Sequence, residues 1–161
     1  ENYTRIIDGK TAVLLAAAAQ GVGLLAGASA ERLQALERFG MAYGRAFQLR
    51  DDYLDLLGDP STLGKPVGGD LREGKATHTV LHLLLEEDSE EARAILARRA
   101  ARQGDVERMA ALAAGSGASE ATRREIAAQA AEAVSALGEF PPSPAREALA
   151  ELAQREVARL R

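Results

Sequence analysis

Apolar residues recur every three or four positions along most of the chain, and no stretch shows the alternation of apolar and polar residues that a β-strand requires. This spacing predicts an all-α protein. Serines able to cap a helix N-terminus stand before four of the expected helices, at positions 29, 89, 119 and 143. The expected helices cover approximately residues 2–26, 30–57, 76–86, 90–103, 106–113, 120–137 and 144–160.

The composition favours closely packed helices in one domain. The chain has 161 residues, of which 47% are apolar and only 4% aromatic, and most of the apolar residues are Ala and Leu. We therefore expect a helical bundle that occupies residues 1–161 as a single domain; the family resemblance given below implies that this domain is partial. Gly40 and Gly44 lie inside an expected helix, where each costs about 1 kcal/mol relative to Ala. Close approach of a neighbouring backbone or a ligand would explain their presence.

The net charge and the cysteine content bear on which classes of protein this chain can belong to. A net charge of −4 argues against a nucleic-acid-binding protein. No run of 18 apolar residues predicts a transmembrane helix. The absence of cysteine is compatible with a cytoplasmic location, which is our expectation. The chain begins at Glu1 without an initiator Met, so we expect a fragment or a trimmed chain.

Three aspartates lie close together near the end of the expected helix 30–57. At 100° per residue, Asp51, Asp52 and Asp55 fall within about a 100° arc of one helix face. Like charges at this spacing repel each other, and a divalent cation that prefers carboxylate oxygen would relieve the repulsion. A solvated acidic face is the alternative interpretation.

The segment that follows the aspartates favours the interpretation of these residues as a cation-binding site. Residues 58–77 contain five glycines and two prolines together with Lys65, Arg72 and Lys75, a composition suited to binding an anion through backbone N–H groups and positive charge. A flexible surface loop is the alternative. Gly69 to Lys75 also matches most of a nucleotide-binding P-loop, but Ala76 stands where that motif needs Ser or Thr, and no strand precedes it. We therefore reject the P-loop interpretation.

Taken together, these motifs resemble the second aspartate-rich region of the trans-isoprenyl diphosphate synthases, also called polyprenyl synthetases. The similar residues run from Phe47 to Asp55 and continue through Gly58-Asp59, Gly64-Lys65, Gly69-Asp70 and Gly74-Lys75-Ala76-Thr77, with Gly9-Lys10-Thr11-Ala12 upstream. The resemblance covers about residues 3–86. It implies an all-α isoprenoid-synthase fold, of which this chain would form the C-terminal half, and a homodimer in the full-length form.

The resemblance also implies a reaction and a set of site residues. The family condenses an allylic diphosphate with isopentenyl diphosphate, using Mg²⁺. By this resemblance, the metal ligands would be Asp51, Asp52 and Asp55. The residues at the reacting carbocation and the diphosphate would be Lys10, Thr11 and Gln48. The remaining substrate-binding residues would be Phe47, Lys65, Asp70 and Lys75. Asp51 is the expected direct ligand.

The chain departs from the family at its first aspartate-rich motif, which is missing. We therefore expect the 161-residue chain alone to be inactive. The main alternative is a non-catalytic, synthase-like subunit that binds a catalytic partner; an unrelated helical interaction module would leave the ordered motifs unexplained. A terpenoid cyclase or head-to-head synthase also uses aspartate-rich helices, but the Gly-Lys continuation disfavours it.

His78 and His82, four residues apart with Glu86 one turn on, could suggest a second metal site; we interpret them as helix-packing residues.

Overall fold

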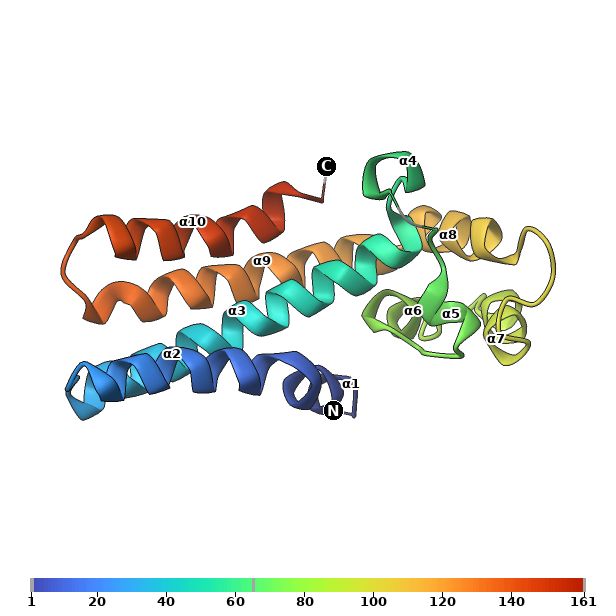
Figure 1. Ribbon diagram of the computed structural model, residues 1–161. Coiled ribbons are helices and arrows are strands. Elements are labelled where there is room, and N and C mark those ends of the chain that lie inside the picture. The colour runs from blue at the N-terminus through green and yellow to red at the C-terminus, as the bar shows by residue number, and fades with distance from the viewer. Residues whose placement is uncertain (1, 65, 161) are drawn as a thin grey trace. The chain divides into compact units, whose positions relative to one another are not determined.

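The computed structural model describes residues 2–64 and 66–160, and within them the regular structure is entirely helical (Figure 1). The all-α prediction is therefore confirmed. The elements are α1 (Asn2–Ile7), the π-helix η1 (Asp8–Ala12), α2 (Val13–Leu25), α3 (Ala30–Leu57), α4 (Pro60–Leu63), α5 (Gly69–Arg72), α6 (His78–Leu83), α7 (Glu90–Ala97), α8 (Asp105–Gly115), α9 (Ala118–Ala136), the 3₁₀-helix η2 (Leu137–Glu139) and α10 (Pro144–Ala158).

The chain forms two compact units, and helices α3 and α9 each contribute to both. The first unit contains residues 1–50 and 125–161, and the second contains residues 51–124. In the first unit, α2 runs beside the early turns of α3 and α10 runs beside α9 (Figure 1). Its buried cluster consists of Phe39, Ala42, Ala133, Ala136, Leu137 and Ala153. The larger cluster of the second unit includes the fully buried side chains of Ile95, Met109 and Val80.

The two glycines inside α3 allow a close contact between backbones. A Cβ atom at Gly40 would lie 2.4 Å from the Cα of Ala16, and one at Gly44 would lie 2.5 Å from the Cα of Ala12. No side chain fits at such distances. The sequence-based expectation of a close backbone neighbour is confirmed, and the neighbours are α2 at Gly40 and the end of η1, which carries Lys10 and Thr11, at Gly44.

Helix boundaries follow the sequence closely in some places and not in others. Helix α3 covers residues 30–57, as predicted, and α10 begins where Ser143 accepts a hydrogen bond from the N–H of Arg146 at 3.2 Å. Ser119 was expected to cap a helix, but it lies inside α9, and its hydroxyl is 3.1 Å from that of Tyr53. Ser116 instead accepts the N–H of Ala118.

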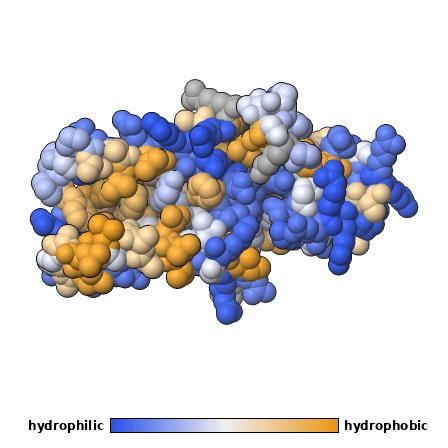
Figure 2. Space-filling model, viewed as in Figure 1, coloured by the Kyte–Doolittle hydropathy of each residue, from blue (hydrophilic) through white to orange (hydrophobic). Residues whose placement is uncertain are grey.

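Helix α2 leaves many apolar side chains in contact with solvent. Leu14, Val22 and Leu25 are 73%, 68% and 92% exposed. Figure 2 shows apolar side chains gathered around a recess on the first unit. A cavity of about 500 Å³ in that unit is lined by residues of α2 and α3 together with Phe140 and Leu149. A helix that is apolar on all sides normally has neighbours on all sides, so a further part of the protein or a second molecule would cover this face. Within residues 2–64 and 66–160, no helix combines the length and the apolar character needed to cross a bilayer.

Candidate active site

The three predicted metal ligands lie in the last two turns of α3, the longest helix. Asp51 and Asp55 are half-buried, and Asp52 is only 7% exposed. Buried Leu56 follows on the same helix, which ends at Leu57 before Gly58, Asp59 and Pro60 begin the short helix α4. The three carboxylates therefore lie at the C-terminal end of a long helix.

Asp55 differs from the other two aspartates because its carboxylate binds the backbone of the Gly/Lys segment. Its two oxygens accept the N–H groups of Gly69 and Asp70 at 3.2 and 2.9 Å. Its main-chain carbonyl accepts the N–H of Gly68 at 2.5 Å. These N–H groups open helix α5, whose first turn has no internal acceptors for them. Asp55 thus anchors the Gly/Lys segment to the end of α3.

Asp70 and Lys75 form an ion pair within that segment. The Nζ atom of Lys75 lies 2.9 Å from Asp70 and 2.5 Å from Glu73, and these two carboxylates raise the pKa of the lysine. The side chain of Lys75 remains 50% exposed. A diphosphate that reached Lys75 would therefore compete with two carboxylates for its charge. Lys65, the other predicted lysine of this segment, lies outside the described residues.

Lys10 and Thr11 lie in the first unit, on the π-helix η1. The hydroxyl of Thr11 donates a 2.7 Å hydrogen bond to the side-chain oxygen of Gln48, which is 4% exposed. The side chain of Lys10 is exposed. π-Helical turns often occur at functional sites because the widened turn redirects side chains. The structure thus brings two predicted catalytic residues into contact.

A neighbouring ion pair fixes this turn against α3. The Nε and Nη2 atoms of Arg45 donate to the two carboxylate oxygens of Asp8 at 2.6 and 2.8 Å. The hydrogen bond to Asp8 raises the pKa of Arg45. Planar, bidentate pairs of this kind are specific in geometry. Neither Asp8 nor Arg45 is among the residues predicted from the sequence, although Asp8 stands only two positions before Lys10.

Phe47, predicted to line the substrate pocket, lies between two side chains of its own helix. The guanidinium carbon of Arg50 is 4.8 Å from the Phe47 ring centroid, and the Tyr43 ring is 6.4 Å away at a tilted angle. Arg50 in turn forms a buried ion pair with Glu156 of α10. Burial raises the pKa of Glu156, and the charge of Arg50 opposes that rise. This ion pair was not predicted from the sequence, because its members lie far apart along the chain.

The two histidines have packing roles in the second unit. The Nδ1 atom of His78 is 2.9 Å from the hydroxyl of Thr122, and its ring centroid is 4.6 Å from that of His82. Thr79 donates to the same Thr122 hydroxyl at 3.0 Å. Across the described residues, no three His, Cys, Asp or Glu side chains converge to hold a metal by themselves.

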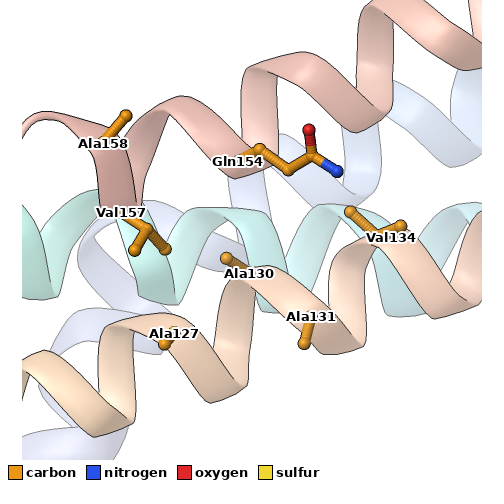
Figure 3. A pocket seen from close by; sticks show the side chains of 7 residues that line it. All are labelled: Ala127, Ala130, Ala131, Val134, Gln154, Val157 and Ala158. Atoms are coloured by element: carbon orange, nitrogen blue, oxygen red, sulfur yellow. The ribbon is translucent and has the colours of Figure 1, made fainter.

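The first unit has a groove between α9 and α10 (Figure 3). This groove of about 540 Å³ is lined by small apolar side chains and by Gln154, which extends over it from α10. Its lining consists of Ala127, Ala130, Ala131, Val134, Gln154, Val157 and Ala158. None of these is among the predicted site residues.

Comparison with known sequences decides the family. A family described as polyprenyl synthetase matches residues 1–113. The chain belongs to the polyprenyl synthetase family. It is 42% identical over 163 aligned residues to the octaprenyl diphosphate synthase of Escherichia coli, with 99% of this chain and 50% of that protein covered. It is 36% identical over 152 residues to an all-trans-nonaprenyl-diphosphate synthase of Rhodobacter capsulatus, with 93% and 46% covered.

Solved polyprenyl synthetase structures match the fold. A decaprenyl diphosphate synthase from Rhodobacter capsulatus superposes with a TM-score of 0.89 and 37% identity, covering 99% of this chain and 50% of that one. A polyprenyl synthase from Caulobacter crescentus, complexed with calcium and isoprenyl diphosphate, gives a TM-score of 0.87 and 40% identity, with 97% and 48% covered. The chain thus spans about half the length of these relatives. Its resemblance to the polyprenyl synthetases is confirmed.

Proposed function

We propose that the protein containing this chain is a prenyltransferase that elongates an allylic diphosphate with isopentenyl diphosphate. The observation that carries the proposal is the family match over residues 1–113, which includes the Asp-Asp-Tyr-Leu-Asp run of α3. In the reaction, the C–O bond of the allylic diphosphate breaks and diphosphate leaves. The isopentenyl double bond attacks the allylic carbon, a C–C bond forms, and a proton is lost.

Asp51 and Asp52 are the proposed Mg²⁺ ligands. Both carboxylates lie near the end of α3, and Mg²⁺ is commonly held by one or two carboxylates together with substrate phosphate oxygens. Such a donor set fits a place where no three protein ligands converge among the described residues. Bound there, Mg²⁺ would neutralise charge on the leaving diphosphate. Because Asp55 already accepts two backbone N–H groups, we assign it the role of holding the Gly/Lys segment in place.

Three lysines are proposed to meet the diphosphate. Lys10 is exposed on η1, and Lys75 is half-exposed in the Gly/Lys segment next to Asp70. The resemblance adds Lys65. Positive charge fixed around a leaving anion stabilises the transition state more than the ground state. Lys75 would exchange its contacts with Asp70 and Glu73 for contacts with phosphate oxygens, so Asp70 would set the position of Lys75 before substrate arrives.

Thr11, Gln48 and Phe47 are proposed to face the reacting carbons. The hydrogen bond between Thr11 and Gln48 orients two side-chain oxygens that can stabilise a carbocation or receive its proton. Phe47 is 36% exposed, which leaves ring surface available to the isopentenyl group. The π-helical turn and the Asp8–Arg45 pair keep Thr11 against α3.

Calorimetry tests the metal assignment on the chain itself. Pyrophosphate or a bisphosphonate is titrated in the presence of Mg²⁺ into the wild type, D51A and the control E151Q, which changes an exposed carboxylate on α10. We expect binding by the wild type and by E151Q, and at least tenfold weaker binding by D51A. Equal binding by D51A and the wild type would count against the assigned site.

Prenyl transfer itself is tested with radiolabelled isopentenyl diphosphate, allylic diphosphates and Mg²⁺. We expect no turnover by the 161-residue chain and turnover by a complete synthase that carries it as the C-terminal half. Ionisation of the allylic diphosphate needs charge on both sides of it, and half of the matched relatives' length is outside this chain. Turnover by the chain alone would contradict the half-enzyme account. An inactive complete protein that raises the activity of another synthase would instead support the non-catalytic subunit.

We further propose that the complete protein is a homodimer located in the cytoplasm. The exposed apolar residues of α2, which include Leu14, Val22 and Leu25, support burial against further protein. The absence of cysteine fits a reducing compartment. Sedimentation velocity of the complete protein tests the dimer, and a single monomeric boundary at micromolar concentration would contradict it. Fractionation of cells that express it tests the location.

A further inference from the structure

Glu156 of α10 contacts the active-site helix through Arg50. One guanidinium nitrogen of Arg50 forms an ion pair with Glu156, and the two side chains are only 8% and 5% exposed. On its other side, Arg50 lies over the Phe47 ring at 4.8 Å. A continuous set of contacts therefore runs from α10 to Phe47, whose side chain is 36% exposed.

The burial of this pair makes Arg50 dependent on Glu156. Among the described residues, the Nε and Nη1 atoms of Arg50 and the Oε2 atom of Glu156 have no hydrogen bond of good geometry. The ion pair is thus the principal compensation for burying both charges, and removing one member leaves the other charge uncompensated. Without Glu156, we expect Arg50 to move toward solvent and to lose its 4.8 Å contact with the Phe47 ring.

Phe47 has two neighbours on its own helix that contact its ring, Arg50 and Tyr43. It is 36% exposed, and the other aromatic neighbour on α3, Tyr43, is tilted at 58° with its centroid 6.4 Å away. Tyr43 is itself stacked on Phe39, with 5.9 Å between the ring centroids. Arg50 provides the closer contact, so the orientation of Phe47 follows the position of the guanidinium.

We propose that Glu156 is a positioning residue for the isopentenyl pocket, holding Arg50 against Phe47 so that the exposed ring keeps one orientation. This inference rests on the proposed function only for the identity of the ligand that Phe47 meets. The chain of contacts itself lies within the first unit and can be tested without activity. No change in charge at the pocket is required, because Glu156 acts through the placement of a neutral ring.

The first test uses ¹⁹F NMR on this chain labelled with 4-fluorophenylalanine. The sequence contains three phenylalanines, and loss of one signal in F47L assigns the Phe47 resonance. We expect E156Q to shift or broaden the Phe47 signal and to leave that of Phe140 in place. The matched control E151Q removes an exposed carboxylate from the same helix and should leave all three signals unchanged. An unchanged Phe47 signal in E156Q would overturn the proposal.

A second variant covers the case in which E156Q fails to fold. R50M/E156L replaces both buried charges with apolar side chains of similar size, an exchange that commonly preserves stability. We expect this variant to fold and its Phe47 signal still to be displaced. A folded R50M/E156L with a wild-type Phe47 signal would show that the pair has only a structural role, and would also overturn the proposal.

Kinetics of a complete synthase carrying this chain give the functional readout. We expect E156Q to raise KM for isopentenyl diphosphate about tenfold while KM for the allylic diphosphate changes little, because a misplaced contact affects the substrate that it meets. F47L should show the same pattern, and F47L/E156Q should be no worse than F47L alone, since both changes act through one ring. Additive effects, or a loss confined to kcat, would overturn the proposal. If the wild-type synthase transfers no prenyl group, the proposed function fails, while the NMR result still decides the positioning role.

Discussion

Thr11 and Gln48 lie in direct contact, with 2.7 Å between the threonine hydroxyl and the glutamine side-chain oxygen. The two residues are 37 positions apart, and each was predicted separately as a catalytic residue from its own motif. Their contact depends on Gly40 and Gly44, which let η1 and α2 approach α3. The packing of small residues in the first unit is therefore also what assembles this part of the site.

Replacing Gly40 tests that packing. In G40A the new methyl group would lie 2.4 Å from the Cα of Ala16, so the helices must separate, and we expect a loss of about 2 kcal/mol in the free energy of unfolding. The control is G21A, whose Cβ meets nothing within 4 Å and which should be neutral or stabilising by about 0.5 kcal/mol. Urea denaturation followed by circular dichroism measures both. A G40A variant as stable as G21A would contradict the close-packing account.

Asp55 is expected to control the order of the Gly/Lys segment. D55N weakens the acceptor for the N–H groups of Gly69 and Asp70, and loss of such a cap typically costs about 1 kcal/mol. Hydrogen exchange at these two amides should therefore become faster. The matched control is D59N, because Asp59 caps α4 through the N–H of Ser61 at 2.9 Å and should affect only that helix. Equal exchange at Gly69 in wild type and D55N would show that the cap is dispensable.

Acid stability should depend on Asp105. The hydrogen bond from Arg98 lowers the pKa of the Asp105 carboxyl from its ordinary value of 3.8 to about 2. A lowered folded-state pKa means that the stabilisation is complete above 3.8 and is lost as the pH falls toward 2. We expect the free energy of unfolding of the wild type to fall over this range more steeply than that of D105N. The control E107Q, an exposed carboxylate on the same helix, should behave like the wild type.

The sequence identified the fold class and the polar motifs because both are local. The apolar spacing of residues 30–57 and the Gly58-Asp59-Pro60 stop predicted α3 correctly at both ends. Helix α7 was predicted to run to residue 103 but ends at Ala97, and Arg99 and Ala100 have positive φ angles. The neighbouring Arg98 is held by Asp105, and nothing in the local pattern indicates that contact.

Contacts between distant residues account for what the sequence did not predict in the site. The binding of Asp55 to two backbone N–H groups depends on the path of the Gly/Lys segment, so a count of carboxylates could not separate Asp55 from Asp51 and Asp52. The pairs Asp8–Arg45 and Arg50–Glu156 join residues on different helices. The π-helical turn at Lys10 and Thr11 has the same apolar spacing as an ordinary helix, so periodicity alone does not reveal it.

The most direct test of the account measures prenyl transfer against Mg²⁺ concentration in a complete synthase carrying D51N, with D55N and E151Q alongside. If Asp51 holds the metal, D51N should lower kcat by roughly 10²–10³-fold and require more Mg²⁺ for half-maximal rate, because stabilisation of the leaving diphosphate is lost. D55N should retain activity within about tenfold, since we assign Asp55 to the backbone of the Gly/Lys segment. E151Q should match the wild type. A D51N synthase with the wild-type rate and Mg²⁺ dependence would contradict the account.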